Sequence, residues 1–205
     1  MSEQQPAALV EPGTTTKLGV IIASTRPGRI GLPIGTWVAE AARAHGGFEV
    51  TVLDLAEIDL PLMDEPNHPR LRQYTKPHTI AWSETVDAQD AFAIVMPEYN
   101  FSFTAPLKNA IDYLSQEWQY KPAALVSYGG ISGGMRAAQQ FKQVLTTLNM
   151  MPIKESMALP FAMNAIVDGV FQPTDTHHAQ AATMFTELQR WTGALQMLRE
   201  TSVTS

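Results

Sequence analysis

The chain has 205 residues, of which 45% are hydrophobic and 17% charged, as is usual for one compact domain. Its formal net charge of -6 excludes nucleic-acid binding through a basic surface, and its lack of cysteine excludes disulfides, thiolate metal sites and a cysteine nucleophile. No apolar run is long enough to span a membrane and no secretory signal is recognisable, so we expect a cytoplasmic protein without membrane or nucleic-acid partners.

The N-terminal part of the chain differs from the rest. Residues 1–16 carry no hydrophobic periodicity and predict a disordered tail. Residues 17–200 predict a single domain in which strand and helix patterns alternate.

The first half of this domain begins with the segment LGVIIA. Its continuous apolar run is typical of a strand buried on both faces of a parallel sheet. A helical pattern follows and ends at Gly46-Gly47. The predicted elements are strand Leu18–Ala23, helix Leu32–His45, strand Phe48–Asp54, a long connection from Leu55 to Lys76, and helix Thr79–Ala88.

The second half repeats the alternation. Thr104 is a predicted N-cap, and Pro106 is tolerated in the first turn of the helix that follows. The predicted elements are strand Ala91–Met96, helix Thr104–Ser115, strand Ala123–Tyr128, helix Gly133–Leu148, strand Met151–Ser156 and helix Thr176–Arg199. Five strands that alternate with helices predict an α/β fold, a doubly wound parallel sheet with helices on both faces.

Three unusual loops follow the first, third and fourth predicted strands, at the edge of the sheet where such folds bind ligands. The first loop lies directly before a helix, whose N-terminal N–H groups favour a phosphate. Here Ser24 can donate a hydroxyl, and Arg26 or Arg29 can pair with a dianion through a forked guanidinium. Gly28 and Gly31 permit close approach of the backbone. A plain turn with two solvated arginines is the alternative.

The other two loops carry aromatic residues and glycines. Residues 97–104 (PEYNFSFT) could stack on a planar ligand, or could pack against a neighbouring element or a second subunit. Residues 128–134 (YGGISGG) contain glycines against which a flat ligand could lie on bare backbone. A flexible glycine-rich turn is the alternative for this third loop.

Four motifs in order carry a family resemblance: S-x-R, then P-E-Y-N, then L-K-N-A-I-D in a helix, then Y-G-G-x-x-G-G. In this respect the chain resembles the NADPH-dependent FMN reductase family of flavodoxin-like proteins, from Lys17 to about Leu148. The resemblance implies that FMN is the cofactor and that NADPH or NADH is the co-substrate. The residues it implies for cofactor binding are Ser24, Arg26, Arg29, Ile30, Gly31, Pro97, Glu98, Tyr99, Asn100, Tyr128, Gly129 and Gly130.

The resemblance also divides these residues among the parts of FMN. It implies the phosphate at Ser24, Arg26 and the following backbone, the edge of the isoalloxazine ring at Pro97–Asn100, and ring contacts from residues 128–130. The chain departs from many relatives by Arg29 in place of Ser, Gly31 in place of Asn, and Thr104-Ala105 in place of Pro-Gly.

The activity that the resemblance implies is an FMN-dependent NAD(P)H oxidoreductase, which passes a hydride from NADPH through FMN to a quinone, flavin, azo dye or metal ion. A flavodoxin-type electron carrier for a protein partner and a flavin-binding protein with a structural or sensing role are the alternatives. Hydride transfer between stacked rings needs no general acid or base, so we expect no catalytic side chain and an orienting role for Glu98.

His68 and His78 lack metal-ligand spacing, and we expect no metal site. A basic group that could select the 2′-phosphate of NADPH consists of Arg70, Arg72 and Lys76.

The aromatic content of residues 98–118 and their surroundings predicts a homodimer or homotetramer with this segment at the interface. Phe101, Phe103, Trp118 and Tyr120 would form an apolar patch too large for an exposed rim. For Trp118, packing in the core is the alternative.

Overall fold

The computed structural model describes residues 15–202 of the chain. The predicted tail therefore lies outside the described residues, apart from Thr15 and Thr16. Thr16 already begins the first strand. The predicted strands and helices all occur with bounds that are the same or shifted by a few residues, except for the last strand.

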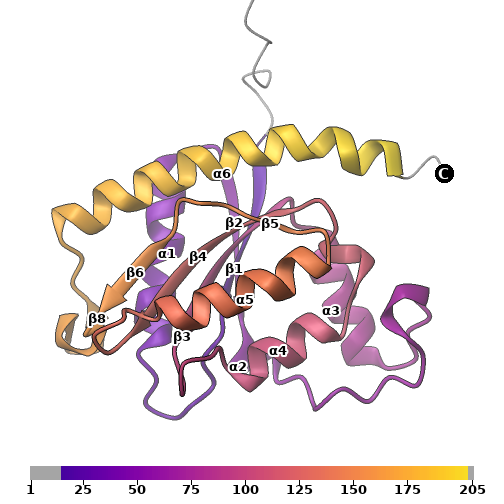
Figure 1. Cartoon of the computed structure of the whole chain (residues 1–205), viewed down its shortest axis with the longest axis horizontal. Coiled ribbons are helices and arrows are strands. Elements are labelled where there is room, and N and C mark those ends of the chain that lie inside the picture. The colour runs from indigo at the N-terminus through magenta and orange to yellow at the C-terminus, as the bar shows by residue number, and fades with distance from the viewer. Residues whose placement is uncertain (1–14, 203–205) are drawn as a thin grey trace, which may run out of the picture.

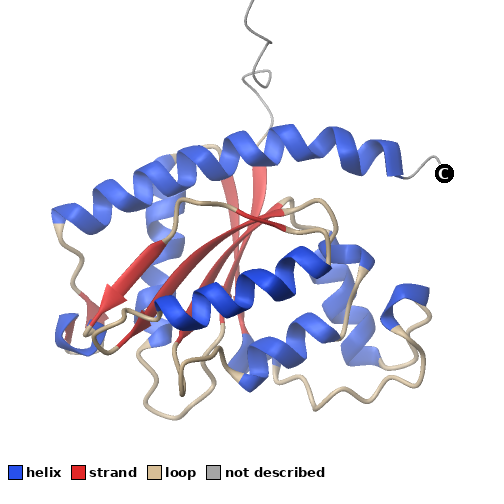
Figure 2. Cartoon of the chain, viewed as in Figure 1, coloured by secondary structure: helices blue, strands red, loops and turns tan. Residues whose placement is uncertain are grey.

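The centre of the structure is a parallel sheet between two groups of helices (Figure 2), and a separate two-stranded antiparallel sheet lies outside it. The strand order is β2-β1-β3-β4-β5, which confirms the predicted doubly wound sheet of five parallel strands. The bounds of these strands are β1 Thr16–Ile22, β2 Phe48–Asp54, β3 Ala91–Pro97, β4 Pro122–Gly129 and β5 Met151–Pro152. Because the chain winds outward in both directions from β1 and β3, the ligand-binding switch point lies between these two strands.

The last predicted strand, Met151–Ser156, is wrong in its extent. Strand β5 ends at Pro152, and a second segment, β6 (Met157–Pro160), pairs with the far end of β4. Pro152 has no N–H to donate to the ladder with β4, so the pairing is weakened at this residue. The break brings the residues after β6 to the carboxyl end of β4.

The helices cover both faces of the sheet (Figure 1). Helices α1 (Gly31–His45) and α6 (Asp175–Ser202) cover one face, and α3 (Pro77–Asp87), α4 (Ala105–Asp112) and α5 (Met135–Thr147) cover the other. Alternate residues of the strands point into these two cores. Along β3, Ala91, Ala93 and Val95 face α1 and α6, whereas Phe92, Ile94 and Met96 face the other helices.

The connection predicted from Leu55 to Lys76 contains two short helices, α2 (Leu55–Ile58) and η1 (Pro69–Leu71). Its second half is held against α3 by the Glu65 carboxylate, which accepts hydrogen bonds from the backbone N–H groups of Thr75 and Lys76. The other short elements are η2 Gln116–Trp118, η3 Ala162–Ala165, β7 Ile166–Val167 and β8 Val170–Phe171.

The predicted start of α4 is reproduced by the structure, and that of α5 is shifted. The hydroxyl of Thr104 accepts from the Leu107 N–H and donates to the Ala23 carbonyl, which confirms the predicted N-cap. Helix α5 begins two residues after its predicted start at Gly133. Gly133 and Gly134 have φ values of 58° and 83°, which lie outside the helical region.

Candidate functional site

A cavity of about 310 Å³ opens at the carboxyl ends of β1, β3 and β4. Its volume is in the range of small-molecule sites, roughly 300–1,000 Å³. The residues that line it are Ser24, Arg26, Gly28, Arg29, Ile30, Pro97, Glu98, Tyr99, Tyr128, Gly129, Gly130, Phe161, Met163 and Asn164. All the residues that the sequence predicts for cofactor binding are therefore gathered here, apart from Gly31 and Asn100.

Gly31 and Asn100 lie beside the cavity rather than on its wall. Gly31 is the buried first residue of α1. A Cβ atom on it would stand 2.5 Å from both the Ser24 Oγ and the Tyr128 hydroxyl, so a side chain at this position would fill the space between them. Asn100 is exposed at the tip of a turn, with a φ of 51°.

The loop after β1 offers an unsatisfied donor to a ligand. Ser24 is only 1% exposed, and its Oγ has no hydrogen-bond partner among the described residues. A buried hydroxyl without a partner carries a desolvation cost that a bound polar group would remove. The adjoining N-terminus of α1 is capped by Ile30, which makes no side-chain hydrogen bond to it, so its N–H groups also face the loop without a capping oxygen. Together these donors fit the phosphate of FMN.

The two arginines of this loop have different environments. The guanidinium of Arg29 forms a forked ion pair with both oxygens of Asp54 and also donates to the Ser24 carbonyl, at 2.8 Å. The hydrogen bonds that Arg29 donates to the Asp54 carboxylate raise the pKa of Arg29 against the opposing effect of burial. Arg26 is exposed and makes no side-chain hydrogen bond or ion pair within residues 15–202. Asp54 therefore occupies the fork of Arg29, and Arg26 is the cation left for a ligand.

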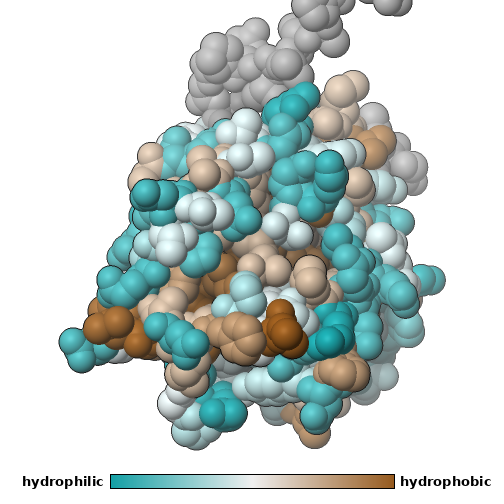
Figure 3. Space-filling view, turned by 60° about the vertical axis from the view of Figure 1, so that its left-hand side comes forward, coloured by the Kyte–Doolittle hydropathy of each residue, from teal (hydrophilic) through white to brown (hydrophobic). Residues whose placement is uncertain are grey.

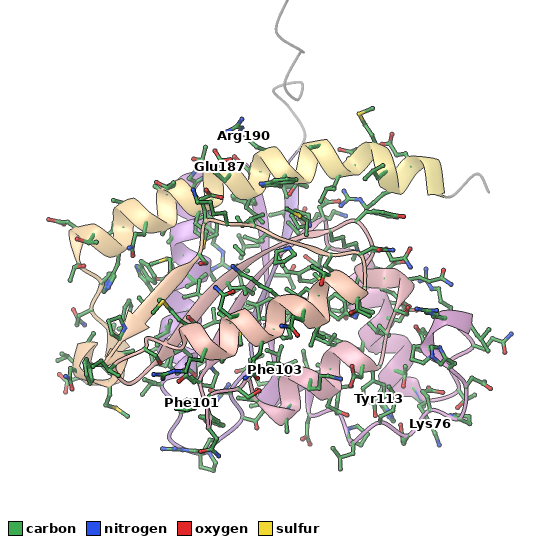
Figure 4. The ribbon with its side chains drawn as sticks, viewed as in Figure 1. Lys76, Phe101, Phe103, Tyr113, Glu187 and Arg190 are labelled. Carbon is green, nitrogen blue, oxygen red and sulfur yellow. The ribbon has the colours of Figure 1, made fainter. Side chains whose placement is uncertain are left out.

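The loop after β3 turns sharply beside the cavity. Tyr99 and Ser102 exchange two backbone hydrogen bonds of 2.9 Å, and both central residues are left-handed, Phe101 with a φ of 69°. This is the geometry of a type I′ turn. Figure 4 shows Phe101 and Phe103 on this rim, below α5. Phe103 packs against Phe141 with ring centroids 5.1 Å apart, so only the Phe101 ring, 61% exposed, projects outward.

Glu98 ties this loop to α5. Its carboxylate accepts from the Ser132 hydroxyl at 3.0 Å and forms an ion pair with Arg136, whose guanidinium also lies 4.3 Å from the Phe101 ring centroid. Desolvation acts to raise the pKa of Glu98, but the hydrogen bonds from Arg136 and Ser132 outweigh it and lower the pKa. A carboxylate with these partners orients the loop, as expected from sequence, and is poorly suited to carry protons.

Replacing Glu98 by Gln is expected to lower the melting temperature of the apoprotein at neutral pH, because the amide loses the ion pair with Arg136. The lowered folded-state pKa means that the stabilisation is present above the unfolded pKa and is lost as pH falls through the folded value. The difference in Tm between wild type and Glu98→Gln should therefore shrink as pH falls below about 4. Calorimetry across this range measures it, and a difference that stays constant into acid would contradict the assignment.

The loop after β4 forms a bare wall of the cavity. Gly130 has no heavy atom within 4 Å of the position of a Cβ and does not have a positive φ. Gly133 and Gly134 differ, because a Cβ on either would lie 2.9 Å or less from backbone atoms. The loop thus leaves open space at Gly130, whereas at Gly133 and Gly134 the close approach of the backbone requires glycine.

Three residues of the cavity were not predicted from the sequence: Phe161, Met163 and Asn164, which follow β6. The Phe161 N–H donates to the Gly130 carbonyl at 3.1 Å, so this segment is joined to the glycine-rich loop. Phe161 and Met163 are 55% and 59% exposed. Figure 3 shows apolar side chains gathered in the lower half of the face at this end of the molecule. The segment lies beyond the motifs that carry the resemblance, and only the broken strand brings it here.

The basic group predicted as a selector of the 2′-phosphate does not line the cavity. Arg72 forms ion pairs with Asp87 and Glu117. Lys76 does not line the cavity, and in the view of Figure 4 it lies well apart from Phe101. Trp118 is fully buried against Trp82 and Phe92, which settles it as a core residue.

Among residues 15–202, His, Asp and Glu side chains form no group of three or more that could hold a metal ion. Across the same described range, no helix combines the length and the apolar character that crossing a membrane requires.

Comparison with known proteins adds to this geometry. The family model described as NADPH-dependent FMN reductase matches residues 16–164. An NAD(P)H-dependent FMN reductase of Schizosaccharomyces pombe is 39% identical over 161 residues, which cover 78% of this chain and 80% of that protein. An NADPH:quinone oxidoreductase of Arabidopsis thaliana is 36% identical over 103 residues, 49% of this chain and 48% of that one. The solved structure of a flavoenzyme NAD(P)H:(acceptor) oxidoreductase from Paracoccus denitrificans has a TM-score of 0.69 at 20% identity, covering 86% of this chain and 97% of its own.

Proposed function

Because the chain belongs to the NADPH-dependent FMN reductase family, we propose that it holds FMN in the cavity between β1, β3 and β4 and serves a small acceptor: a quinone, free flavin, azo dye or metal ion. The observation that carries this proposal is the unpartnered, buried Ser24 hydroxyl beside the N-terminus of α1. FMN bound there would supply the redox chemistry, because its ring can take up a hydride from NADPH and pass the electrons on to the acceptor. The side chains and backbone of the cavity supply binding, orientation and exclusion of water.

Three parts of the cavity would receive the phosphate, the polar edge of the ring and the face of the ring. Ser24, Arg26 and the N–H groups of α1 would hold the phosphate, as the donors left unpaired in this region. The backbone after β3, from Pro97 to Tyr99, lines the cavity next to the glycine-rich loop and would receive the polar edge of the ring. Gly130 leaves open space against which the face of the ring can lie.

A second planar molecule would find an apolar surface in the same cavity. Phe161 and Met163 line it and remain more than half exposed. This surface favours transfer to a small planar acceptor over delivery of electrons to a protein, because a ring can enter the cavity itself. Relatives of the chain include proteins described as quinone oxidoreductases, which is consistent with a quinone as one such acceptor.

The test is anaerobic mixing of the FMN-loaded protein with NADPH, followed by a panel of quinones, FMN, ferric chelates and azo dyes. We expect rapid bleaching of the flavin absorbance by NADPH and its return when an acceptor is added. A flavodoxin-type carrier or a sensor would show slow or no bleaching by NADPH alone. Failure of the apoprotein to bind FMN would overturn the proposal altogether.

We also propose that the protein is a cytoplasmic homodimer or homotetramer. The apolar patch expected from the sequence is not exposed as a whole, because Trp118 is in the core and Phe103 packs on Phe141. The exposed apolar side chains around the rim are instead Phe101, Ile131, Met135, Phe161 and Met163. Light scattering at micromolar concentration is expected to give at least twice the mass of one chain, with a smaller mass for a Phe101→Ser, Ile131→Ser variant. A monomer across this concentration range would rule the assembly out.

A further inference from the structure

The hydroxyl of Tyr128 reaches the phosphate end of the cavity from an unexpected direction. Tyr128 lies on β4, and its ring is packed in the core beneath α1 and α6, leaving the residue 4% exposed. Strand β3 separates β4 from β1. The side chain nevertheless extends to the loop after β1, because its hydroxyl and the Ser24 Oγ both stand 2.5 Å from the point where a Cβ of residue 31 would lie.

Gly31 makes this arrangement possible. Any side chain at the first position of α1 would occupy the space that the two hydroxyls share. The helix therefore begins with a residue that leaves its N-terminal N–H groups, the Ser24 hydroxyl and the Tyr128 hydroxyl around one point. Three kinds of neutral donor converge there, and Arg26 adds an uncommitted positive charge at the rim.

We propose that the Tyr128 hydroxyl is a phosphate-binding donor, which acts together with the Ser24 hydroxyl and is given its place by the missing side chain at Gly31. The inference rests on the proposed FMN site and assigns Tyr128 to the phosphate as well as to the ring. It makes Tyr128 a residue that discriminates FMN from riboflavin, which lacks the phosphate.

The protonation state of Tyr128 suits this role. Burial raises the pKa of the phenol to about 12, against the opposing effects of the neighbouring Ser24, Arg29 and Arg26. The hydroxyl therefore keeps its proton at neutral pH and can donate it in a hydrogen bond to a phosphate oxygen. A hydrogen bond to a charged group is stronger than one between neutral groups, so losing it should be measurable in the affinity.

The experiment compares the affinities of the apoprotein for FMN and for riboflavin, which has the same ring and ribityl chain but no phosphate. Flavin fluorescence quenching gives both dissociation constants. Tyr128→Phe is expected to weaken FMN binding about ten-fold and to leave riboflavin binding unchanged, so the ratio of the two affinities falls about ten-fold. Tyr113→Phe is the matched control, because its hydroxyl lies outside the cavity and donates to Pro61 and Asp64. That control should keep the wild-type ratio.

The ratio of the FMN and riboflavin affinities distinguishes phosphate binding by Tyr128 from a purely structural role. If Tyr128 only supports the fold or touches the ring, Tyr128→Phe weakens both flavins equally or neither, and the inference is overturned while the proposed FMN site stands. If the wild-type protein binds neither flavin, the proposed function itself fails. Thermal melts of the apoproteins check that each variant is folded.

Gly31→Ala provides a second variant that keeps the tyrosine. The added Cβ would displace the Tyr128 and Ser24 hydroxyls, so FMN affinity should again fall selectively, by at least as much as in Tyr128→Phe. In the double variant Gly31→Ala, Tyr128→Phe the two losses should be less than additive, because both act on the same hydroxyl. Fully additive losses would mean that residues 31 and 128 act at separate places and would overturn the inference.

Discussion

Replacement of Gly130 by valine is expected to slow anaerobic flavin reduction by NADPH about a hundred-fold, since a misplacement of reacting groups by about 1 Å has effects of this size. Gly130 lines the cavity, and the position of its Cβ is open, so the valine side chain would project into the space for the rings. The residue does not have a positive φ and fills no core position, so the backbone should accept valine without strain.

The folded state of Gly130→Val should therefore be close to wild type. A thermal melt of the apoprotein checks this, and Ala44→Val, which adds the same side chain to an exposed position of α1, is the matched control. The control should retain both the melting temperature and the rate of flavin reduction. A Gly130→Val protein that binds FMN and is reduced at the wild-type rate would show that the loop after β4 is not part of the site.

Replacement of the two arginines of the first loop by alanine should affect different properties, FMN affinity for Arg26 and folding stability for Arg29. Arg26→Ala is expected to weaken FMN binding by about 1.5–3 kcal/mol, roughly ten- to a hundred-fold, without a change in stability, because its guanidinium is the cation left for the phosphate. Arg29→Ala should weaken FMN binding less. Its main effect should be on folding, because it leaves the buried Asp54 carboxylate without its ion pair, at a cost of about 3 kcal/mol.

Titration with FMN and urea unfolding of the same variants measure the two effects. Arg190→Ala is the control for loss of an exposed arginine, since Arg190 lies on the outer face of α6 and pairs with Glu187 (Figure 4). It should leave both the affinity and the free energy of unfolding close to wild type. Equal FMN affinities for wild type and Arg26→Ala would refute the phosphate assignment of Arg26.

The sequence by itself determined the layout of the sheet and the place of the cavity. Strands such as Ala91–Pro97 are short apolar runs that end in glycine, proline or polar residues, and this pattern depends only on local chain properties. Parallel pairing then requires that the carboxyl ends of β1, β3 and β4 meet at one edge. The three loops after these strands were therefore expected to form one site before any contact between them was known.

Tertiary structure alone decided which polar groups in that site are free. Arg26 and Arg29 are equivalent as residue types in one loop, and the difference between them comes from Asp54, which β2 brings alongside. The same holds for Tyr128, whose hydroxyl meets Ser24 across β3, and for Phe161, which reaches the cavity only because the last strand breaks after Pro152. Local pattern is set by neighbours along the chain, whereas the partner of a charge or hydroxyl is set by packing between segments that are distant in sequence. This is why the position of the site could be predicted, but the pairing of its side chains could not.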